Sequence, residues 1–137
     1  MEERATPVLQ YSFLCRELKR HPEAGAVVSA NDIVFDFGQV QGKRLGIILV
    51  NCWTGCAGTF FERSELTDED GRVVASTSIH KFTLADAMSR YLRADRLIFD
   101  VPRPGVYWLV VFLEDVAAMR YPVRIRLPEE GEPPPPQ

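Results

Sequence analysis

The sequence has no long run of apolar residues. The run at residues 45–50 is interrupted by Gly46, and this run, like every other in the sequence, is much shorter than the ~18 apolar residues of a membrane-spanning helix. The chain begins with the acidic Met-Glu-Glu-Arg, without the charged and then apolar order of a signal peptide. We therefore expect a cytoplasmic protein with no membrane partner.

Positive charge is also scarce. The 16 Lys and Arg residues are outnumbered by 19 Asp and Glu residues, which gives a formal net charge of −3. A protein that binds nucleic acid needs a surplus of basic side chains to neutralise phosphates. This composition predicts that the protein has no nucleic-acid partner.

Motifs of catalysis and cofactor binding are absent as well. The sequence has no P-loop, no G-x-S-x-G nucleophile elbow, no H-E-x-x-H zinc motif and no G-x-G-x-x-G dinucleotide motif. No pair of carboxylates stands out as an acid–base couple. We expect no cofactor and no enzymatic activity.

The sequence has only three cysteines and two histidines, the usual residues of zinc sites and thiol enzymes. An odd number of cysteines without an export signal favours free thiols. Cys52 and Cys56 have a C-x3-C spacing and could complete a Cys3His zinc site with Cys15 and His80. Cys15 and Cys52 share strand faces with apolar residues, which favours structural thiols in the core. A nucleophilic thiol with His80 as its base is a further alternative.

Alternation of apolar and polar residues is the dominant pattern. The 137 residues suffice for one domain, and 46% of them are apolar. Apolar residues recur at every second position in many segments, which is typical of half-buried strands. About eight strands are expected, at residues 8–15, 27–37, 44–53, 59–66, 72–82, 97–101, 106–113 and 121–127. Their number and spacing predict an all-β, two-layer antiparallel β-sandwich, Ig-like or jelly-roll-like.

Three of these strands have distinctive sequences. Residues 106–113 are apolar throughout and predict a strand that is buried on both faces in the middle of a sheet. Residues 121–127 alternate cleanly, and Pro122 within them predicts an edge strand. Glu62, Arg63 and Glu65 make a further strand polar, and we interpret them as a solvent-facing side.

One short helix is expected near residues 84–92. Its apolar residues recur at helical spacing: Leu84, Ala87, Met88, Tyr91 and Leu92. Thr83 and Asp86 resemble a capping box at its start. Because so short a helix is marginal by itself, we expect it to pack on an open end of the sheets.

The strands define a single β-sandwich domain at residues 8–127. Residues 1–7 are polar up to Pro7 and predict a flexible N-terminus. Residues 128–137 are rich in Pro and Glu and predict a disordered tail.

Aromatic residues are the best candidates for a binding surface. Tyr107 and Trp108 lie in the most apolar strand and are expected in the core. Trp53 ends a strand next to Thr54 and Gly55, so we expect it to be partly exposed, where a sugar ring could stack on it.

Three stretches of the chain suggest a family. They are Gln10–Glu17, the acidic turn at Leu66–Gly71, and Val101–Tyr107 with its Pro-Gly-x-Tyr turn. In these stretches and their order, residues 8–127 resemble a family of small bacterial β-sandwich proteins of unknown function. The resemblance implies the sandwich fold, and it implies no activity and no functional residue.

The sequence thus favours a non-catalytic protein-interaction or assembly module, whose partner is another protein or a second copy in a homodimer. A β-sandwich that binds carbohydrate or another small ligand is the first alternative, and a thiol- or metal-dependent enzyme is the second. The candidate ligand or surface residues are Trp53, Cys52, Cys56 and His80.

Overall fold

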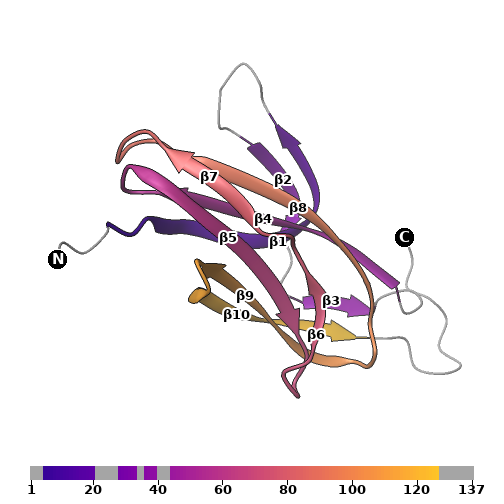
Figure 1. Ribbon diagram of the computed structural model, residues 1–137. Helices are drawn as coiled ribbons and strands as arrows, with labels where there is room; N and C mark the ends of the chain where they lie inside the picture. The colour runs from indigo at the N-terminus through magenta and orange to yellow at the C-terminus, as the bar shows by residue number, and fades with distance from the viewer. Residues whose placement is uncertain (1–4, 21–27, 34–35, 40–43, 127–137) are drawn as a thin grey trace, which may run out of the picture.

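The computed structural model describes residues 5–20, 28–33, 36–39 and 44–126 (Figure 1). These residues form ten β-strands and no helix. In chain order the strands are β1 (Val8–Arg20), β2 (Val28–Ile33), β3 (Asp36–Gln39), β4 (Arg44–Thr54), β5 (Gly58–Thr67), β6 (Val73–Ser76), β7 (His80–Leu84), β8 (Tyr91–Asp100), β9 (Gly105–Leu113) and β10 (Val116–Arg126).

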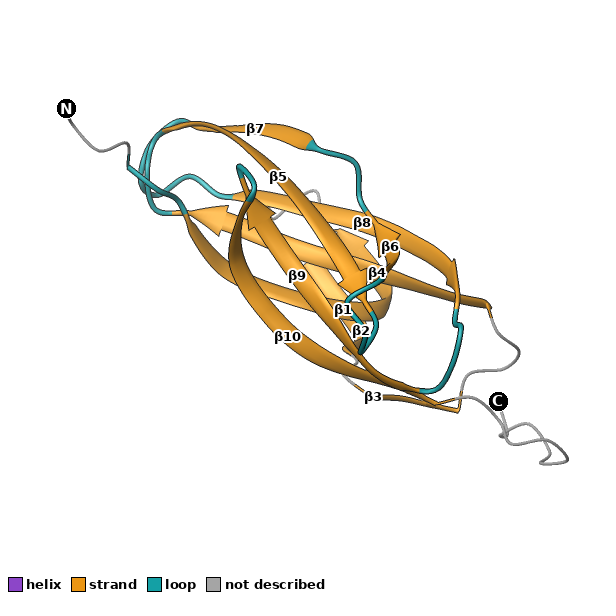
Figure 2. Cartoon of the chain, turned by 60° about the horizontal axis from the view of Figure 1, so that its bottom comes forward, coloured by secondary structure: helices purple, strands orange, loops and turns teal. Residues whose placement is uncertain are grey.

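The strands form two sheets that pack face to face. One sheet has four strands in the order β2-β1-β4-β8, and the other has six, in the order β3-β10-β9-β5-β6 with β7 also paired to β5. Figure 2 shows β9 and β10 in one layer, with β1 and β4 in the layer behind them. The predicted two-layer β-sandwich is confirmed. All pairings are antiparallel except that between β10 and β3, which is parallel.

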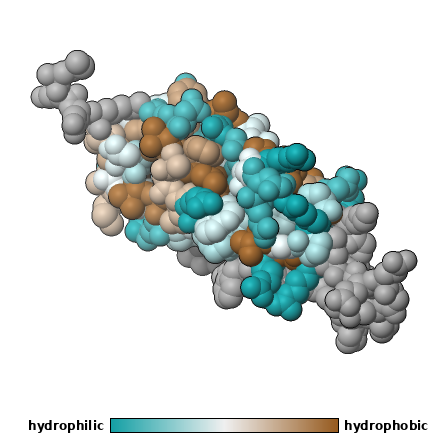
Figure 3. Space-filling view, turned by 90° about the horizontal axis from the view of Figure 1, so that it is seen from below, coloured by the Kyte–Doolittle hydropathy of each residue, from teal (hydrophilic) through white to brown (hydrophobic). Residues whose placement is uncertain are grey.

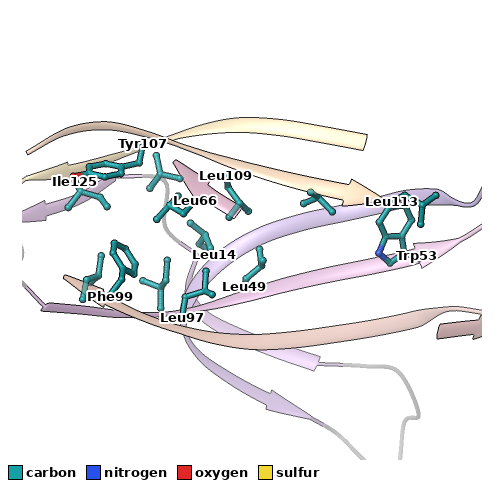
Figure 4. Packing of buried hydrophobic residues seen from close by; sticks show 14 of the residues in the cluster. Leu14, Leu49, Trp53, Leu66, Leu97, Phe99, Tyr107, Leu109, Leu113 and Ile125 are labelled. Atoms are coloured by element: carbon teal, nitrogen blue, oxygen red, sulfur yellow. The ribbon is translucent and has the colours of Figure 1, made fainter. Parts of the chain in front are cut away.

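The core fills the space between the sheets, and alternation along the strands builds it. Leu14 and Leu49 come from the four-stranded sheet and face Leu66 and Leu109 of the other sheet (Figure 4). A fully buried side chain of this size stabilises the fold by about 1.5–3 kcal/mol relative to an exposed one. Burial of these side chains is therefore what holds the two layers together.

The strand count exceeds the expected eight because two predicted strands are each divided. Residues 27–37 contain both β2 and β3, and residues 72–82 contain β6 and the start of β7. Between β6 and β7, Thr77 leaves the ladder and binds Ser64 on β5. The Thr77 amide donates to the Ser64 carbonyl at 3.0 Å, and the Ser64 amide donates to the Thr77 hydroxyl at 2.9 Å.

The helix predicted near residues 84–92 is wrong. Leu84 is the last residue of β7 and Tyr91 is the first of β8. The residues between them form a turn in which Asp86 accepts hydrogen bonds from the amides of Met88 and Ser89, both at 2.9 Å. Met88, at the centre of the predicted apolar stripe, is 73% exposed. Pairing with β5 and β4 outweighs the weak intrinsic preference of so short a segment for a helix.

Strand β9 is not buried on both faces as predicted. It lies between β10 and β5, so its central place in a sheet is confirmed. Its side chains alternate, however, with Tyr107 and Leu109 fully buried and Trp108 and Phe112 half-buried on the outer face. The expectation that Trp108 lies in the core is therefore wrong.

The edge strand predicted at residues 121–127 is also only partly observed. At its C-terminal end β10 pairs with β3, at Arg124 and Arg126, so this end is not an edge. From Val116 to Pro122, β10 pairs only with β9 among the described strands. Leu127, the N-terminal residues 1–4 and the tail at 128–137 lie outside the described residues, whereas Pro7 is described and buried.

Candidate functional site

The cysteines lie apart from the polar groups of the interior. In β4, Cys52 lies between Asn51 and Trp53, whose side chains both bind residues of the opposite sheet. Because neighbouring side chains of a strand point to opposite faces, the Cys52 thiol points to the outer face of its sheet. Cys15 follows the core residue Leu14 in β1 and points the same way. Burial raises the pKa of both thiols, which disfavours a reactive thiolate.

His80 occupies the opposite side of that sheet from Cys52. It starts β7 and lies directly across the ladder from Glu62 of β5. Its Nε2 accepts a hydrogen bond from the guanidinium of Arg93 at 2.6 Å and lies 3.4 Å from Asp95 Oδ1. The structure thus does not bring His80 to a thiol.

Zinc ligands are not assembled in the described part of the chain. No group of three or more His, Cys, Asp and Glu side chains there is arranged to hold a metal ion. Cys56, in the turn after β4, is partly exposed, while Cys15 and Cys52 are buried in strands. All three thiols are free.

Trp53 is fully buried, so the expectation that it is partly exposed is wrong. Pairing of β1 with β4 extends past it to Val8 and Thr54, which places Trp53 inside the ladder. Its ring stacks on Phe82 at 5.7 Å between centroids, and Figure 4 shows it inside the sandwich near Leu113. No face of the indole is open for a sugar ring to stack on.

A buried polar layer lies between the sheets beside Trp53. The indole Nε1 donates to Glu62 Oε2 at 2.5 Å, and Asn51 Nδ2 donates to Ser64 Oγ at 3.2 Å. Glu62 and Asn51 are only 3% and 2% exposed. Oε1 of Glu62 and Oδ1 of Asn51 have no hydrogen-bond partner. Our interpretation of Glu62 as part of a solvent-facing side is therefore wrong.

The environment of Glu62 favours its neutral form. Burial raises the pKa of Glu62 from 4.5 to about 7, although the hydrogen bonds from Trp53 and Asn51 oppose this. Asp95 raises the pKa further and Arg93 lowers it. Arg93 is itself bound to Asp95 at 2.9 Å, so these two charges largely offset each other.

The sequence contains a signal for this layer. Glu62 and Ser64 fall between Phe60 and Leu66 on one face of β5, and both apolar residues are buried. Polar residues that share one face of a strand with core residues point inwards with them. The partners from β4, β7 and β8 could not be predicted, because only the pairing of the strands brings them together.

An apolar groove of about 570 Å³ lies between the start of β1 and the start of β10. Pro7 and Val8 form one wall, Val116 and Ala117 form the other, and Leu113 lies between them. Figure 3 looks onto the molecule from the side of β9 and β10 and shows apolar side chains gathered towards the end where the N-terminal trace leaves.

The outer face of β9 and β10 carries arginines stacked on aromatic rings. Arg120 lies over the ring of Trp108 at 3.7 Å from its centroid, and Arg63 lies over Phe112 at 4.0 Å. Arg63 also binds Glu65 at 2.6 Å and a second carboxylate, that of Asp115, at 3.2 Å.

We call this surface the arginine face and define it as Trp108, Arg120 and Arg124. Arg124 is exposed on the same side of β10 as Arg120, because Val123 and Ile125 face the core. Among the side chains that the structure describes, Arg120 forms no ion pair with a carboxylate. The arginine face therefore presents two exposed guanidinium groups beside an indole ring.

Comparison of the sequence with protein-family models and with curated proteins finds no match. The resemblance to small bacterial β-sandwich proteins stays a prediction. In the part of the chain that the structure describes, no helix is long and apolar enough to cross a membrane.

Proposed function

We propose that the protein is a non-catalytic interaction module that binds an extended acidic segment of a partner protein on the arginine face. The observation that carries this proposal is the stacking of Arg120 on Trp108 beside the exposed Arg124. Tryptophan and arginine are the residues most enriched among those that dominate binding energy at interfaces. A carboxylate that meets Arg120 gains both the guanidinium charge and the apolar surface of the indole beneath it.

The spacing of the two arginines suits an extended partner. They are four residues apart on one face of β10, which corresponds to about 13 Å at 3.3 Å per residue. An extended segment with acidic side chains at positions i and i+4 has the same spacing. Between them, the side chain at i+2 would lie over Pro122, which is opposite Trp108 in the ladder, and an apolar residue fits there.

Binding through this face is favoured over pairing with the free edge of β10. A β-bulge between Ala117 and Met119 interrupts the register of that edge, and Pro122 lacks an amide donor. Both features disfavour the addition of another strand to this edge. Recognition by the side chains of the arginine face does not need a regular edge.

The chemistry also favours a protein partner over the other candidates. A two-fold contact between two copies would bring the same arginines together, which is repulsive. Nucleic acid would need more basic side chains than two, in a chain with a net charge of −3. The apolar groove at the start of β10 would accept many kinds of group, whereas the arginine face selects carboxylates.

We also propose a reducing compartment such as the cytoplasm. All three cysteines are free, and two of them are buried in strands without a disulfide partner. This supports a protein that folds without an oxidising environment.

The test uses the full chain labelled with ¹⁵N and a synthetic peptide with glutamates at i and i+4 and leucine at i+2. The expected result is a shift of the Trp108 indole resonance on titration, lost in Arg120→Gln and in Arg124→Gln. Arg96→Gln is the matched control, because Arg96 is an exposed arginine on β8 in the other sheet. A peptide with glutamine in place of glutamate should cause no shift.

Two results would overturn the proposal. One is that the glutamate peptide leaves the Trp108 indole unshifted in the folded protein. The other is that a single-stranded oligonucleotide shifts it at lower concentration than the peptide does, which would assign the face to nucleic acid.

A further inference from the structure

Two buried oxygen atoms between the sheets have no hydrogen-bond partner among the described residues. Oε1 of Glu62 and Oδ1 of Asn51 both belong to side chains that are almost completely inaccessible. The Asn51 carboxamide is a neighbour of the Glu62 carboxyl group and, like the Trp53 indole, lowers its pKa against the larger effect of burial. Both atoms are acceptors when Glu62 is ionised, and buried acceptors without a donor are unfavourable.

We propose that the folded protein binds a proton at Glu62, and that loss of this proton changes the environment of Trp53. The proton comes from solvent and forms an O–H bond at Oε1, so the carboxylate becomes a neutral acid. That O–H is the donor that the layer otherwise lacks. Oε2 keeps the hydrogen bond from the Trp53 indole in both states.

The groups that face Glu62 from each packed strand are consistent with a neutral acid. Strand β8 contributes Arg93 and Asp95, which form an ion pair with each other. Strand β7 contributes His80, whose Nε2 lies 2.6 Å from the guanidinium of Arg93. Across the other ladder, β9 places Leu113 opposite Glu62.

Among the described side chains around Glu62, the cation Arg93 is offset by its own ion pair with Asp95. Strand β4 contributes only the uncharged Asn51 and Trp53. The guanidinium of Arg93 is engaged by both Asp95 and His80. His80 and Asp95 are partly exposed, with side chains 20% and 16% accessible, so the proton has a short route from solvent past them.

This inference does not depend on the proposed function, since the polar layer lies inside the sandwich and the arginine face lies outside it. Its test needs no partner. The full chain is labelled with ¹³C at the glutamate carboxyls and ¹⁵N at the tryptophan indoles, and both signals are followed by NMR from pH 4 to pH 9.

The expected result is a Glu62 carboxyl titration with its midpoint near pH 7. The Trp53 indole resonance should shift with the same midpoint, whereas that of Trp108 on the outer face should not. Glu62→Gln should abolish the shift of Trp53, and Glu65→Gln, on the outer face of the same strand, should leave it unchanged.

A Glu62 carboxyl that titrates at its ordinary value near pH 4.5, or that is ionised throughout the range, would overturn the inference. A Trp53 indole that is unaffected while Glu62 titrates near pH 7 would overturn the link between them. Since both signals are first measured on the unmodified protein, the outcome does not depend on the folding of any variant.

Discussion

The indole Nε1 of Trp53 donates a hydrogen bond to Oε2 of Glu62 at 2.5 Å across the interior of the sandwich. Trp53 comes from β4 of one sheet and Glu62 from β5 of the other, so this bond joins the two layers. It gives a buried carboxyl group one partner and leaves its second oxygen without one. Several properties of the protein should depend on this pair.

The stability of the protein should depend on pH through Glu62. The pKa of Glu62 is about 7 when folded and 4.5 ordinarily, so between these values only the folded state keeps the proton. The free energy of unfolding contributed by this proton is fully present below pH 4.5 and is lost as the pH rises through 7. Glu62→Gln should therefore be more stable than the parent at pH 8 by roughly 3 kcal/mol, and nearly equal to it at pH 4.

Urea unfolding of both proteins at a series of pH values measures this difference in the free energy of unfolding. The contributions of all other titratable groups cancel because the two proteins share them. Glu65→Gln serves as the control and should show no such trend. A constant difference between Glu62→Gln and the parent from pH 4 to pH 8 would contradict the account of Glu62.

Loss of the Trp53 donor should be costly. Trp53→Phe removes the indole N–H, leaves Oε2 of Glu62 without its partner and reduces the packing against Phe82. We expect a loss of about 2–4 kcal/mol in the free energy of unfolding. Trp108→Phe, on the outer face, should cost about 1 kcal/mol or less.

The same measurement can test whether Trp53 and Glu62 act together. When Trp53→Phe and Glu62→Gln are combined, their separate effects on the free energy of unfolding should not add, because each residue is the other's partner. Additive effects would show that the two side chains contribute independently.

The core between the sheets should be sensitive to truncation and the outer face should not. Leu109 is fully buried on the inner side of β9, so Leu109→Ala should cost about 2–5 kcal/mol. Val110 is the next residue along the strand but lies on the outer face, and Val110→Ala should cost less than about 1.5 kcal/mol. Equal midpoints in urea for the two variants would contradict the assignment of inner and outer faces.

The three thiols should differ in reactivity. Cys56 is partly exposed, whereas Cys15 and Cys52 are buried and their pKa values are raised by burial. Iodoacetamide should therefore modify Cys56 first in the native protein, and the other two only after unfolding. Mass spectrometry of peptides from the labelled protein measures this order. Rapid labelling of Cys52 in the native state would show that its thiol is accessible.

The alternation of residues was sufficient to predict the sandwich, because period-2 patterns mark half-buried strands wherever they occur. The alternation could not distinguish one long strand from two. It continues through Thr77, where hydrogen bonds to Ser64 interrupt the ladder between β6 and β7. The helical spacing from Leu84 to Leu92 arose by chance across a turn between two strands. Local spacing therefore misled where long-range pairing decided the structure.

The sites were harder to predict than the fold. Trp53 was expected near a loop, but pairing of β1 beyond it placed it in the interior. Every residue of its strand is apolar, which predicts Trp108 in the core. The other sheet covers only one face of this sheet, and Trp108 lies on the opposite, outer face. Arg120 lies far from it in sequence and meets it through the β9–β10 ladder.

The most direct test of the proposed function is the affinity of the glutamate peptide for the parent protein and for the variant with both Arg120→Gln and Arg124→Gln, measured by calorimetry. The account predicts that the double variant binds at least about tenfold more weakly than the parent and than Arg96→Gln, and that added salt weakens binding to the parent. Equal affinity of the parent and the double variant, with both folded, would contradict it.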